Sequence, residues 1–140
     1  MAVANTYCPD SRGAIIWRDY CMLKYSDLDF LGQIDTKNGF NMESGDGVDF
    51  NFTIAVRSLM NGLYFIAMQR PMLFASETVR KVDGNKTLYG MVQCTRDLSP
   101  NDCRTCLESA TDGLSDRKVG ARFVYGSCNL RFEIYPFLNN

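Results

Sequence analysis

The fold of this 140-residue chain is decided by the stretch Cys94-Thr-Arg-Asp-Leu-Ser-Pro-Asn-Asp-Cys103-Arg-Thr-Cys106. Its C-x8-C-x2-C spacing has three explanations. A redox pair would place Cys103 and Cys106 in the first turn of a helix, where the dipole lowers a thiol pKa, but Cys94 and Cys128 would then have no purpose. A zinc site would have enough thiolates, yet its first spacing exceeds the usual two to four residues. Structural cross-links between a strand, a helix and the last hairpin use all four cysteines.

A helix is predicted directly after Cys94. Ser99 is a good N-cap, Pro100 suits the first helical position, and Gly113 is a natural terminator. The residues expected on one face of this helix are Cys103, Cys106, Leu107 and Ala110.

A longer amphipathic helix is predicted upstream, capped by Asp49 or Asn51 and ended before or at Pro71. Its apolar positions follow three-and-four spacing: Phe52, Val56, Leu59, Leu63 and Ile66. Between the two helices, residues 74–82 and 87–94 flank a polar turn at 83–85, which predicts a β-hairpin.

The two ends of the chain repeat one pattern at an offset of 107 residues, from Gly13 to Gly120, so that Cys21 aligns with Cys128. Each copy has two short β-rich segments separated by a polar turn, which predicts a hairpin. The N-terminal hairpin must pack on something, since a lone hairpin is at best marginally stable. The order helix, two strands, helix, two strands predicts an α+β fold, in which two helices pack on one face of an antiparallel sheet.

The composition excludes several classes of protein. The chain has no histidine, so a Ser-His-Asp triad, a Cys-His dyad and a His-ligated metal site are ruled out. A net charge of -1, from 15 basic and 16 acidic side chains, argues against binding to nucleic acid. The uncharged stretch from Ser58 to Gln69 is too short to cross a bilayer of roughly 30 Å. We find no nucleophile-base pair, and we expect no enzymatic activity, metal or cofactor.

The compartment is inferred from the cysteines, because the first residues lack the basic and apolar regions of a secretory signal. An even number of six cysteines favours a disulfide framework in an extracellular protein. The glycosylation sequons at Asn51 and Asn85 agree with that location. The alternative is a reduced intracellular protein with free thiols. Residues 32–49 are polar, rich in Gly, Asp and Asn, and without a period, so we expect a linker or long loop there.

Further motifs accompany the cysteine stretch: Leu88-Tyr89-Gly90-Met91-Val92-Gln93-Cys94, Asp97-Leu98-Ser99, Asp102-Cys103-Arg104-Thr105-Cys106-Leu107, Gly120-Ala121-Arg122-Phe123 and Cys128-Asn129-Leu130-Arg131-Phe132-Glu133-Ile134-Tyr135-Pro136-Phe137. In this order they resemble the plant ginkbilobin-like cysteine-rich family, also called the stress-antifungal domain or domain of unknown function 26. The segment from Cys8 to Ser26 looks like the closing hairpin of a preceding domain of the same kind.

The resemblance implies a division of the chain and a set of disulfides. We expect 1–31 to be the closing hairpin of a truncated preceding domain, 32–49 a linker, and 50–140 the ginkbilobin-like domain. The family pattern pairs Cys94 with Cys103 and Cys106 with Cys128, and it leaves one bridge of the domain missing. Cys8 and Cys21 would have partners in the absent part of the preceding domain, so by elimination they are paired with each other.

The resemblance also implies mannose binding linked to antifungal activity, through an Asn, an Arg and a Glu. Arg122 and Glu133 occupy two of these positions, and the Asn has no counterpart. A guanidinium donates and a carboxylate accepts hydrogen bonds, which suits the hydroxyls of a sugar. The alternative for this pair is a cross-strand ion pair without any ligand.

The expected protein is therefore a plant extracellular (apoplastic) binding domain without catalysis. Its expected partner is a cell-wall glycan of the mannose type, as for a defence lectin. The alternative is an extracellular protein, as for a module of a secreted or receptor-like signalling protein. A homodimer would form if the N-terminal hairpin completed the sheet of another chain.

Overall fold

The β-forming segments of the chain assemble into two sheets, one in each of two compact units. The computed structural model describes residues 6 and 8–138, and the units are Met1–Gly32 and Gln33–Asn140. The first holds a two-stranded sheet and the second a five-stranded sheet with two helices. Each unit is described by itself.

The first unit contains the predicted N-terminal hairpin. Strands β1 (Gly13–Trp17) and β2 (Met22–Ser26) pair antiparallel, with Trp17 opposite Met22 at the turn and Gly13 opposite Ser26 at the open end. A hydrogen bond from the amide of Arg18 to the carbonyl of Cys21, at 2.8 Å, closes the turn.

The predicted bond between Cys8 and Cys21 is wrong, because both cysteines are free. Cys21 lies in the turn that follows Trp17, whereas Cys8 precedes Gly13 at the open end of the hairpin. The length of β1 separates these two ends by about 13 Å. A disulfide requires Cα atoms within about 7 Å, so residues 9–12 would have to fold back along β1 for the two thiols to meet.

Helix α2 (Phe50–Ala67) follows the predicted apolar pattern. Asp49 is the N-cap, and its side chain accepts a hydrogen bond from the amide of Asn51 at 3.4 Å. The buried residues of this helix are Phe52, Thr53, Val56, Leu59, Met60, Leu63, Tyr64 and Ala67. Ile66, which was also predicted to face the core, lies at the border of the buried stripe and is 36% exposed.

Helix α3 (Pro100–Asp112) has the predicted cap and terminator. The side chain of Ser99 accepts a hydrogen bond from the amide of Asp102 at 3.1 Å, and Gly113 is the C-cap. Its buried face carries Cys103, Cys106, Leu107, Ala110 and Thr111.

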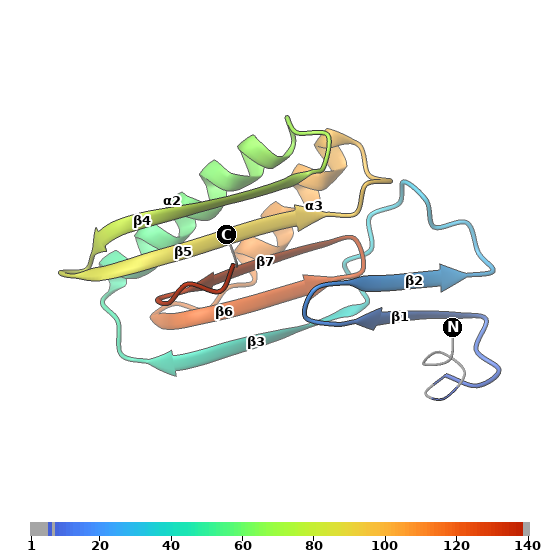
Figure 1. The fold of residues 1–140 in the computed structure, drawn as a ribbon, viewed down its shortest axis with the longest axis horizontal. Helices are drawn as coiled ribbons and strands as arrows, with labels where there is room; N and C mark the ends of the chain where they lie inside the picture. Colours follow the sequence, from blue (N-terminus) through green and yellow to red (C-terminus); the bar gives the residue numbers. More distant parts are fainter. Residues whose placement is uncertain (1–5, 7, 139–140) are drawn as a thin grey trace. The chain divides into compact units, whose positions relative to one another are not determined.

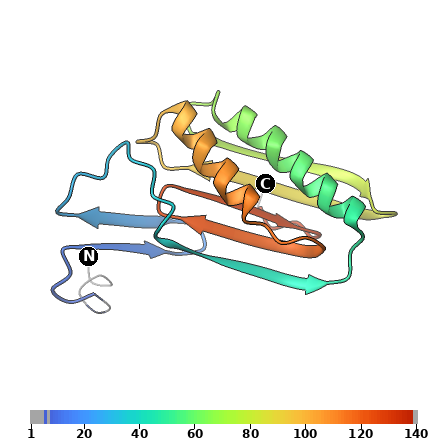
Figure 2. The same ribbon diagram turned by 180° about the vertical axis from the view of Figure 1, so that it is seen from behind.

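The five strands are antiparallel and are ordered β3-β6-β7-β5-β4. Strands β4 (Phe74–Val82) and β5 (Lys86–Cys94) form the predicted hairpin, as do β6 (Lys118–Tyr125) and β7 (Cys128–Glu133). Figures 1 and 2 show both helices on the same face of this sheet. The largest fully buried side chains between these layers include Phe52, Met60, Leu63, Leu88, Leu107, Leu130 and Phe132. The predicted α+β fold, with two helices on one face of an antiparallel sheet, is confirmed.

The prediction of a linker over 32–49 is wrong. Strand β3 (Gly39–Asp46) occupies much of that segment and pairs with β6 at the edge of the sheet, from Gly39 opposite Tyr125 to Asp46 opposite Lys118. Seven of its eight residues are exposed. Phe40 and Met42 alternate with Asn41 and Glu43, but this alternation covers only four residues in a segment rich in Gly, Asp and Ser, so it does not stand out in the sequence.

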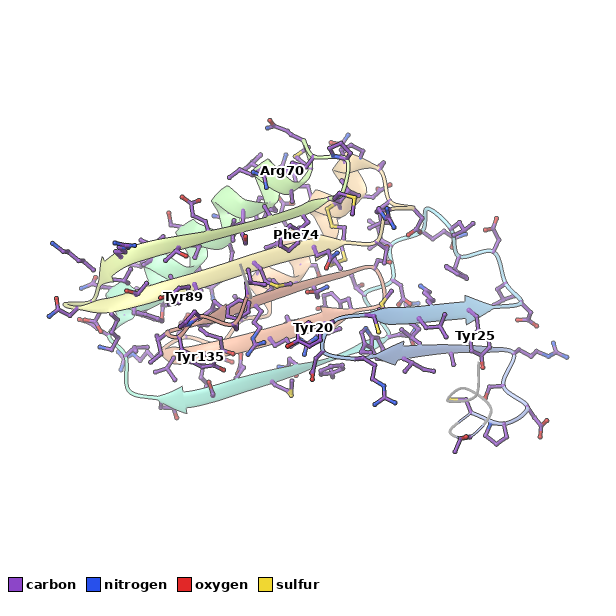
Figure 3. The ribbon with its side chains drawn as sticks, viewed as in Figure 1. Tyr20, Tyr25, Arg70, Phe74, Tyr89 and Tyr135 are labelled. Carbon is purple, nitrogen blue, oxygen red and sulfur yellow. A yellow bond between two sulfur atoms is a disulfide. The ribbon has the colours of Figure 1, made fainter. Side chains whose placement is uncertain are left out.

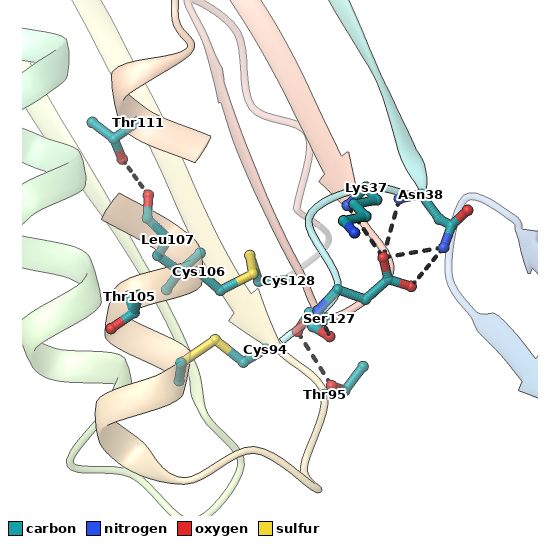
Figure 4. Close-up of a disulfide and its surroundings, with 12 residues drawn as sticks. Lys37, Asn38, Cys94, Thr95, Thr105, Cys106, Leu107, Thr111, Ser127 and Cys128 are labelled. Atoms are coloured by element: carbon teal, nitrogen blue, oxygen red, sulfur yellow. Dashed lines mark hydrogen bonds between the residues drawn. A yellow bond between two sulfur atoms is a disulfide. The ribbon is translucent and has the colours of Figure 1, made fainter. Parts of the chain in front are cut away.

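The segment that precedes β3 is also fixed to the sheet. The amide of Asp35 donates to the Ser127 hydroxyl at 2.8 Å, and that hydroxyl donates to the carbonyl of Gln33 at 3.1 Å. The amide of Gly126 donates to the carbonyl of Asn38 at 2.8 Å. Figure 4 shows the polar network between Asn38 and Ser127 next to the turn that joins β6 and β7. The five-stranded unit therefore begins near Gln33 rather than at residue 50.

Candidate functional site on the open face of the sheet

The open face of the five-stranded sheet is the face that carries no helix. The residues of β6 that pack on the core are Val119, Ala121, Phe123 and Tyr125. Because successive side chains alternate between the two faces, Arg122 lies on the open face. On β7 the same alternation places Arg131 and Glu133 there. The segment after β7 turns back across this face (Figure 1), where Tyr89 and Tyr135 also lie (Figure 3).

Arg131 is the centre of the contacts on this face. Its Nε donates to Glu133 Oε1 at 3.1 Å, and its Nη2 donates to the Tyr135 hydroxyl at 3.2 Å. Its guanidinium carbon lies 4.4 Å from the centre of the Phe137 ring, a cation-π contact. Residues 133, 135 and 137 thus all contact Arg131. The Arg131 side chain holds the segment after β7 in place.

Glu133 is held tightly and is only 8% exposed. Its carboxylate lies against the backbone of Gly120, where a Cβ atom would collide with a carboxylate oxygen and approach Ser44 Oγ to 2.9 Å. A glycine at position 120 therefore makes room for the carboxylate. This steric requirement accounts for the glycine of the Gly-Ala-Arg stretch that ends at Arg122.

Arg122 has a different environment. It is half-buried, and its Cα partners are Met42 on β3 and Arg131 on β7. Within the described residues, the Arg122 side chain makes no hydrogen bond or ion pair. The predicted alternative of a cross-strand ion pair between Arg122 and Glu133 is therefore wrong, because Arg131 holds that carboxylate. The structure does place Arg122 and Glu133 on the same face, one on each of two neighbouring strands.

This arrangement determines which hydrogen bonds the face can offer a ligand. The guanidinium of Arg122 is a planar set of donors with no acceptor, and none of its donors is used by a described residue. The Glu133 carboxylate is nearly buried, and its Oε1 is already engaged by Arg131. Two arginines and one carboxylate leave an excess of positive charge on this part of the face.

The four cysteines of the predicted framework form two disulfides, Cys94–Cys103 and Cys106–Cys128. The first joins the end of β5 to α3, and the second joins α3 to the start of β7 (Figure 4). The redox and zinc explanations are wrong, because Cys103 and Cys106 are bonded to different partners and all four thiols are used. The framework fixes α3 to the two central strands of the sheet.

The two sequons lie in different settings. Asn85 is exposed in the turn between β4 and β5. Asn51 is exposed in the first turn of α2, but the Thr53 of its sequon is buried, and the Thr53 hydroxyl accepts a hydrogen bond from the amide of Arg117 at 2.8 Å. In the folded protein, the complete sequon is accessible only at Asn85.

Two groups away from Arg122 have perturbed pKa values. Burial raises the pKa of the Tyr64 hydroxyl, and the nearby Glu108 carboxylate adds to this effect. The hydrogen bond from Lys118 Nζ to Asp46 Oδ1 raises the pKa of that lysine. Neither group adjoins Arg122 in the sheet register, so neither sets the charge of the candidate site.

Sequence reasoning missed three residues of the face: Arg131, Tyr135 and Phe137. The signal was present, because these residues and Glu133 alternate with period two along the end of the chain. The pattern is hard to assign from the sequence because it continues past Glu133, the last residue of β7, into a segment that forms no further strand.

The family of the chain follows from comparison with known proteins. A family model described as salt stress response/antifungal matches residues 38–135. The chain belongs to this family. The resemblance to ginkbilobin-like domains is thereby confirmed, and the match begins within the segment that was predicted to be a linker.

Curated relatives of this stress-antifungal chain include plant proteins. The chain is 45% identical to an antimicrobial ginkbilobin-2-like protein of Castanea crenata over 94% of its own length and 56% of the relative. It is 39% identical to cysteine-rich repeat secretory protein 38 of Arabidopsis thaliana, over 94% and 54% respectively. The chain thus spans about half the length of the curated relatives that it matches.

Solved structures share the fold of this stress-antifungal chain. The tandem DUF26 ectodomain of the cysteine-rich receptor-like protein PDLP8 of Arabidopsis thaliana matches with a TM-score of 0.71 at 25% identity, over 94% of this chain and 60% of that one. The corresponding ectodomain of PDLP5 has a TM-score of 0.68 at 21% identity, over 96% and 62%. No helix in the described part of the chain is long and apolar enough to span a membrane.

Proposed function

We propose that this chain is an extracellular carbohydrate-binding domain of a plant defence protein, and that the open face of its sheet is the binding surface. Family membership supports a defence role, since the family model is described as antifungal and one relative is named as antimicrobial. Two buried disulfides and relatives named as secretory support an extracellular location. Binding rather than catalysis fits a site built from arginine, glutamate and aromatic side chains.

The observation that carries this proposal is the uncommitted guanidinium of Arg122 on the open face. Unused donors that are partly removed from water are strong hydrogen-bonding groups for a ligand, because their interactions are less screened than in bulk solvent. The neighbouring rings of Tyr89 and Tyr135 provide apolar surfaces on the same face. Polar groups of fixed geometry beside aromatic rings are typical of sites that bind small molecules.

A glycan array probed with the intact chain tests the proposal. We expect binding to plant or fungal cell-wall glycans, weakened in Arg122→Ala and retained in Arg80→Ala. Arg80 is an exposed arginine on the edge strand β4, three strands away from β6, so its removal is a matched change of charge at a distance from Arg122. The proposal fails if no glycan binds, or if both variants lose binding equally. Mannose-type oligosaccharides are the first ligands to try, because Arg122 and Glu133 match the family positions.

A protein-interaction module is the second candidate, and the exposed apolar side chains of the open face favour it. Met42, opposite Arg122, is 53% exposed, and Tyr135, in the segment after β7, is 50% exposed. Capture of a defined extracellular protein by the purified chain, together with the absence of any glycan binding, would favour this function. A homodimer is a special case, and sedimentation of the chain at several concentrations would detect it.

A further inference from the structure

We infer that Arg122 binds the carboxylate of an acidic sugar, so that the ligand of the open face is a uronate-containing oligosaccharide rather than a neutral one. This inference rests on the proposed function and specifies its ligand class. It follows from a row of four side chains across the open face, which we call the arginine row: Met42, Arg122, Arg131 and Met91.

The arginine row is set by the strand register. Met42 on β3 is the Cα partner of Arg122 on β6, Arg122 is the partner of Arg131 on β7, and Arg131 is the partner of Met91 on β5. Partners in adjacent antiparallel strands have their Cβ atoms about 4.5–5.5 Å apart. The row therefore brings two guanidinium side chains together between two methionines.

Two like charges directly opposite each other destabilise a sheet. In this row only one of the two charges is compensated. Arg131 has Glu133 at 3.1 Å, whereas Arg122 has no ion pair within the described structure. Arg122 therefore carries an uncompensated positive charge beside a second arginine. An anion is the complementary partner of such a site.

The neighbours of the row strengthen attraction to an anion. The methionine side chains on both sides cannot donate or accept strong hydrogen bonds, so they do not compete with the guanidinium groups for an anion, and Arg122 itself is half-buried. Charges interact more strongly where the local dielectric constant is low. A carboxylate also matches the planar fork of an arginine with two parallel hydrogen bonds.

The small number of accessible acceptors beside Arg122, among the described residues, argues against a neutral sugar. Each hydroxyl of a neutral sugar both donates and accepts, so its site needs acceptors as well as donors. The Glu133 carboxylate is nearly buried, with Oε2 against Gly120 and Oε1 accepting from Arg131. Arg122 offers donors only, and these satisfy a carboxylate completely but satisfy only half of the needs of a hydroxyl.

The sugar part of the ligand is inferred from what surrounds the row. The four strands from β3 to β5 span about 14 Å at about 4.8 Å per neighbouring pair, which accommodates a short oligosaccharide lying across the strands. The ring of Tyr135, half exposed and held by its hydroxyl on Arg131, offers an apolar surface on which the C–H side of a sugar ring can stack. A compact inorganic anion would bind the charge of Arg122, but it would use neither the span across the four strands nor the ring of Tyr135.

Calorimetric titration of the whole chain with a galacturonate trisaccharide tests the inference. The fully methyl-esterified trisaccharide is the matched ligand, because it keeps the rings and loses the charge. We expect binding of the acidic form that weakens at least about tenfold on esterification, and by the same factor in Arg122→Ala, since one charge-assisted pair is lost. Arg122→Lys keeps the charge without the fork and should lie between. Arg80→Ala should bind like the original chain.

Two further measurements separate the site from nonspecific attraction. The Nε–H resonance of Arg122, assigned by its loss in Arg122→Lys, should shift on titration with the acidic trisaccharide. Affinity should also fall as sodium chloride rises from about 0.05 M to about 0.5 M, because salt screens exposed charges. Circular dichroism of each variant establishes that it is folded, which separates lost binding from lost structure.

The alternative outcomes are distinct. Equal or tighter binding of mannotriose would overturn the inference and leave the proposed function standing. Failure of every saccharide to bind would overturn both. Equal competition by acetate would overturn the sugar part and leave only an anion site. Tighter binding of a poly-glutamate peptide than of the trisaccharide would overturn the inference in favour of a protein ligand.

Discussion

Replacing Arg131 by alanine should destabilise the chain, whereas replacing Arg122 should not, although the two arginines are neighbours in one row. Among the described residues, Arg131 alone holds the carboxylate of Glu133, which is 8% exposed, and it contacts Tyr135 and Phe137. Arg122 holds no described side chain. The comparison therefore separates an arginine that supports the fold from one that is left for a ligand.

The expected magnitude follows from these contacts. Leaving a nearly buried carboxylate without its charged donor costs about 1.5–3 kcal/mol. The loss of the ring contact with Phe137 adds about 0.5 kcal/mol. Because 28% of the Arg131 side chain is exposed and water replaces part of what is lost, we expect Arg131→Ala to lower the free energy of unfolding by about 2–3 kcal/mol. Arg122→Ala removes a like-charge pair and should raise it by up to about 1 kcal/mol.

Urea unfolding followed by circular dichroism at the helix band measures this difference, because α2 and α3 both lie in the five-stranded unit. Arg80→Ala is the control for loss of a surface charge. Combining Arg131→Ala with Glu133→Gln should recover part of the loss, since the stranded carboxylate is then neutral. The reasoning is refuted if Arg131→Ala costs less than about 1 kcal/mol, or if Arg122→Ala costs as much.

Three further results are expected. Replacing Cys106 and Cys128 together by alanine should lower the free energy of unfolding by about 3 kcal/mol, as urea titration would measure, because the bond closes a loop with a sequence separation of 22 residues. Alkylation without reduction, followed by peptide mass analysis, should label Cys8 and Cys21 and no other cysteine, and an unlabelled pair would restore the rejected bond. Because the pKa of Tyr64 is raised on folding, its contribution is complete below the unfolded pKa of about 10 and is lost as pH rises through the folded value. Tyr64→Phe should therefore reduce the alkaline loss of stability in melts at a series of pH values, and an unchanged alkaline profile would contradict this.

Local signals in the sequence were sufficient for most of the fold. Ser99, Pro100 and Gly113 mark both ends of α3, and the apolar spacing that follows Asp49 marks α2. Each of these signals depends on residues close together in the chain, where capping and helical periodicity act. The same locality made the hairpin with its turn at 83–85 predictable.

Elements that depend on distant partners were not predictable in this way. Strand β3 has only a four-residue alternation of its own, and it becomes a strand by pairing with β6, which follows more than seventy residues later. The predicted bond between Cys8 and Cys21 failed for a similar reason. The number of residues between two cysteines does not show that they lie at opposite ends of a hairpin. For the site, the resemblance named Arg122 and Glu133, and the structure places both on the open face. The ion pair of Glu133 depends instead on Arg131, whose role appears only when the segment after β7 folds back.

The attachment of residues 33–38 to the β6–β7 turn has a mechanical consequence. A force that pulls on the chain from the N-terminal side first loads the hydrogen bonds of Ser127 with Gln33 and Asp35. If these break, the load reaches β3 at Gly39, one end of an edge strand whose bonds to β6 then open one pair at a time. The strands β5 and β7, joined to α3 by disulfides, would resist much larger forces. The hydrogen bonds of Ser127 therefore protect the edge strand β3 from tension.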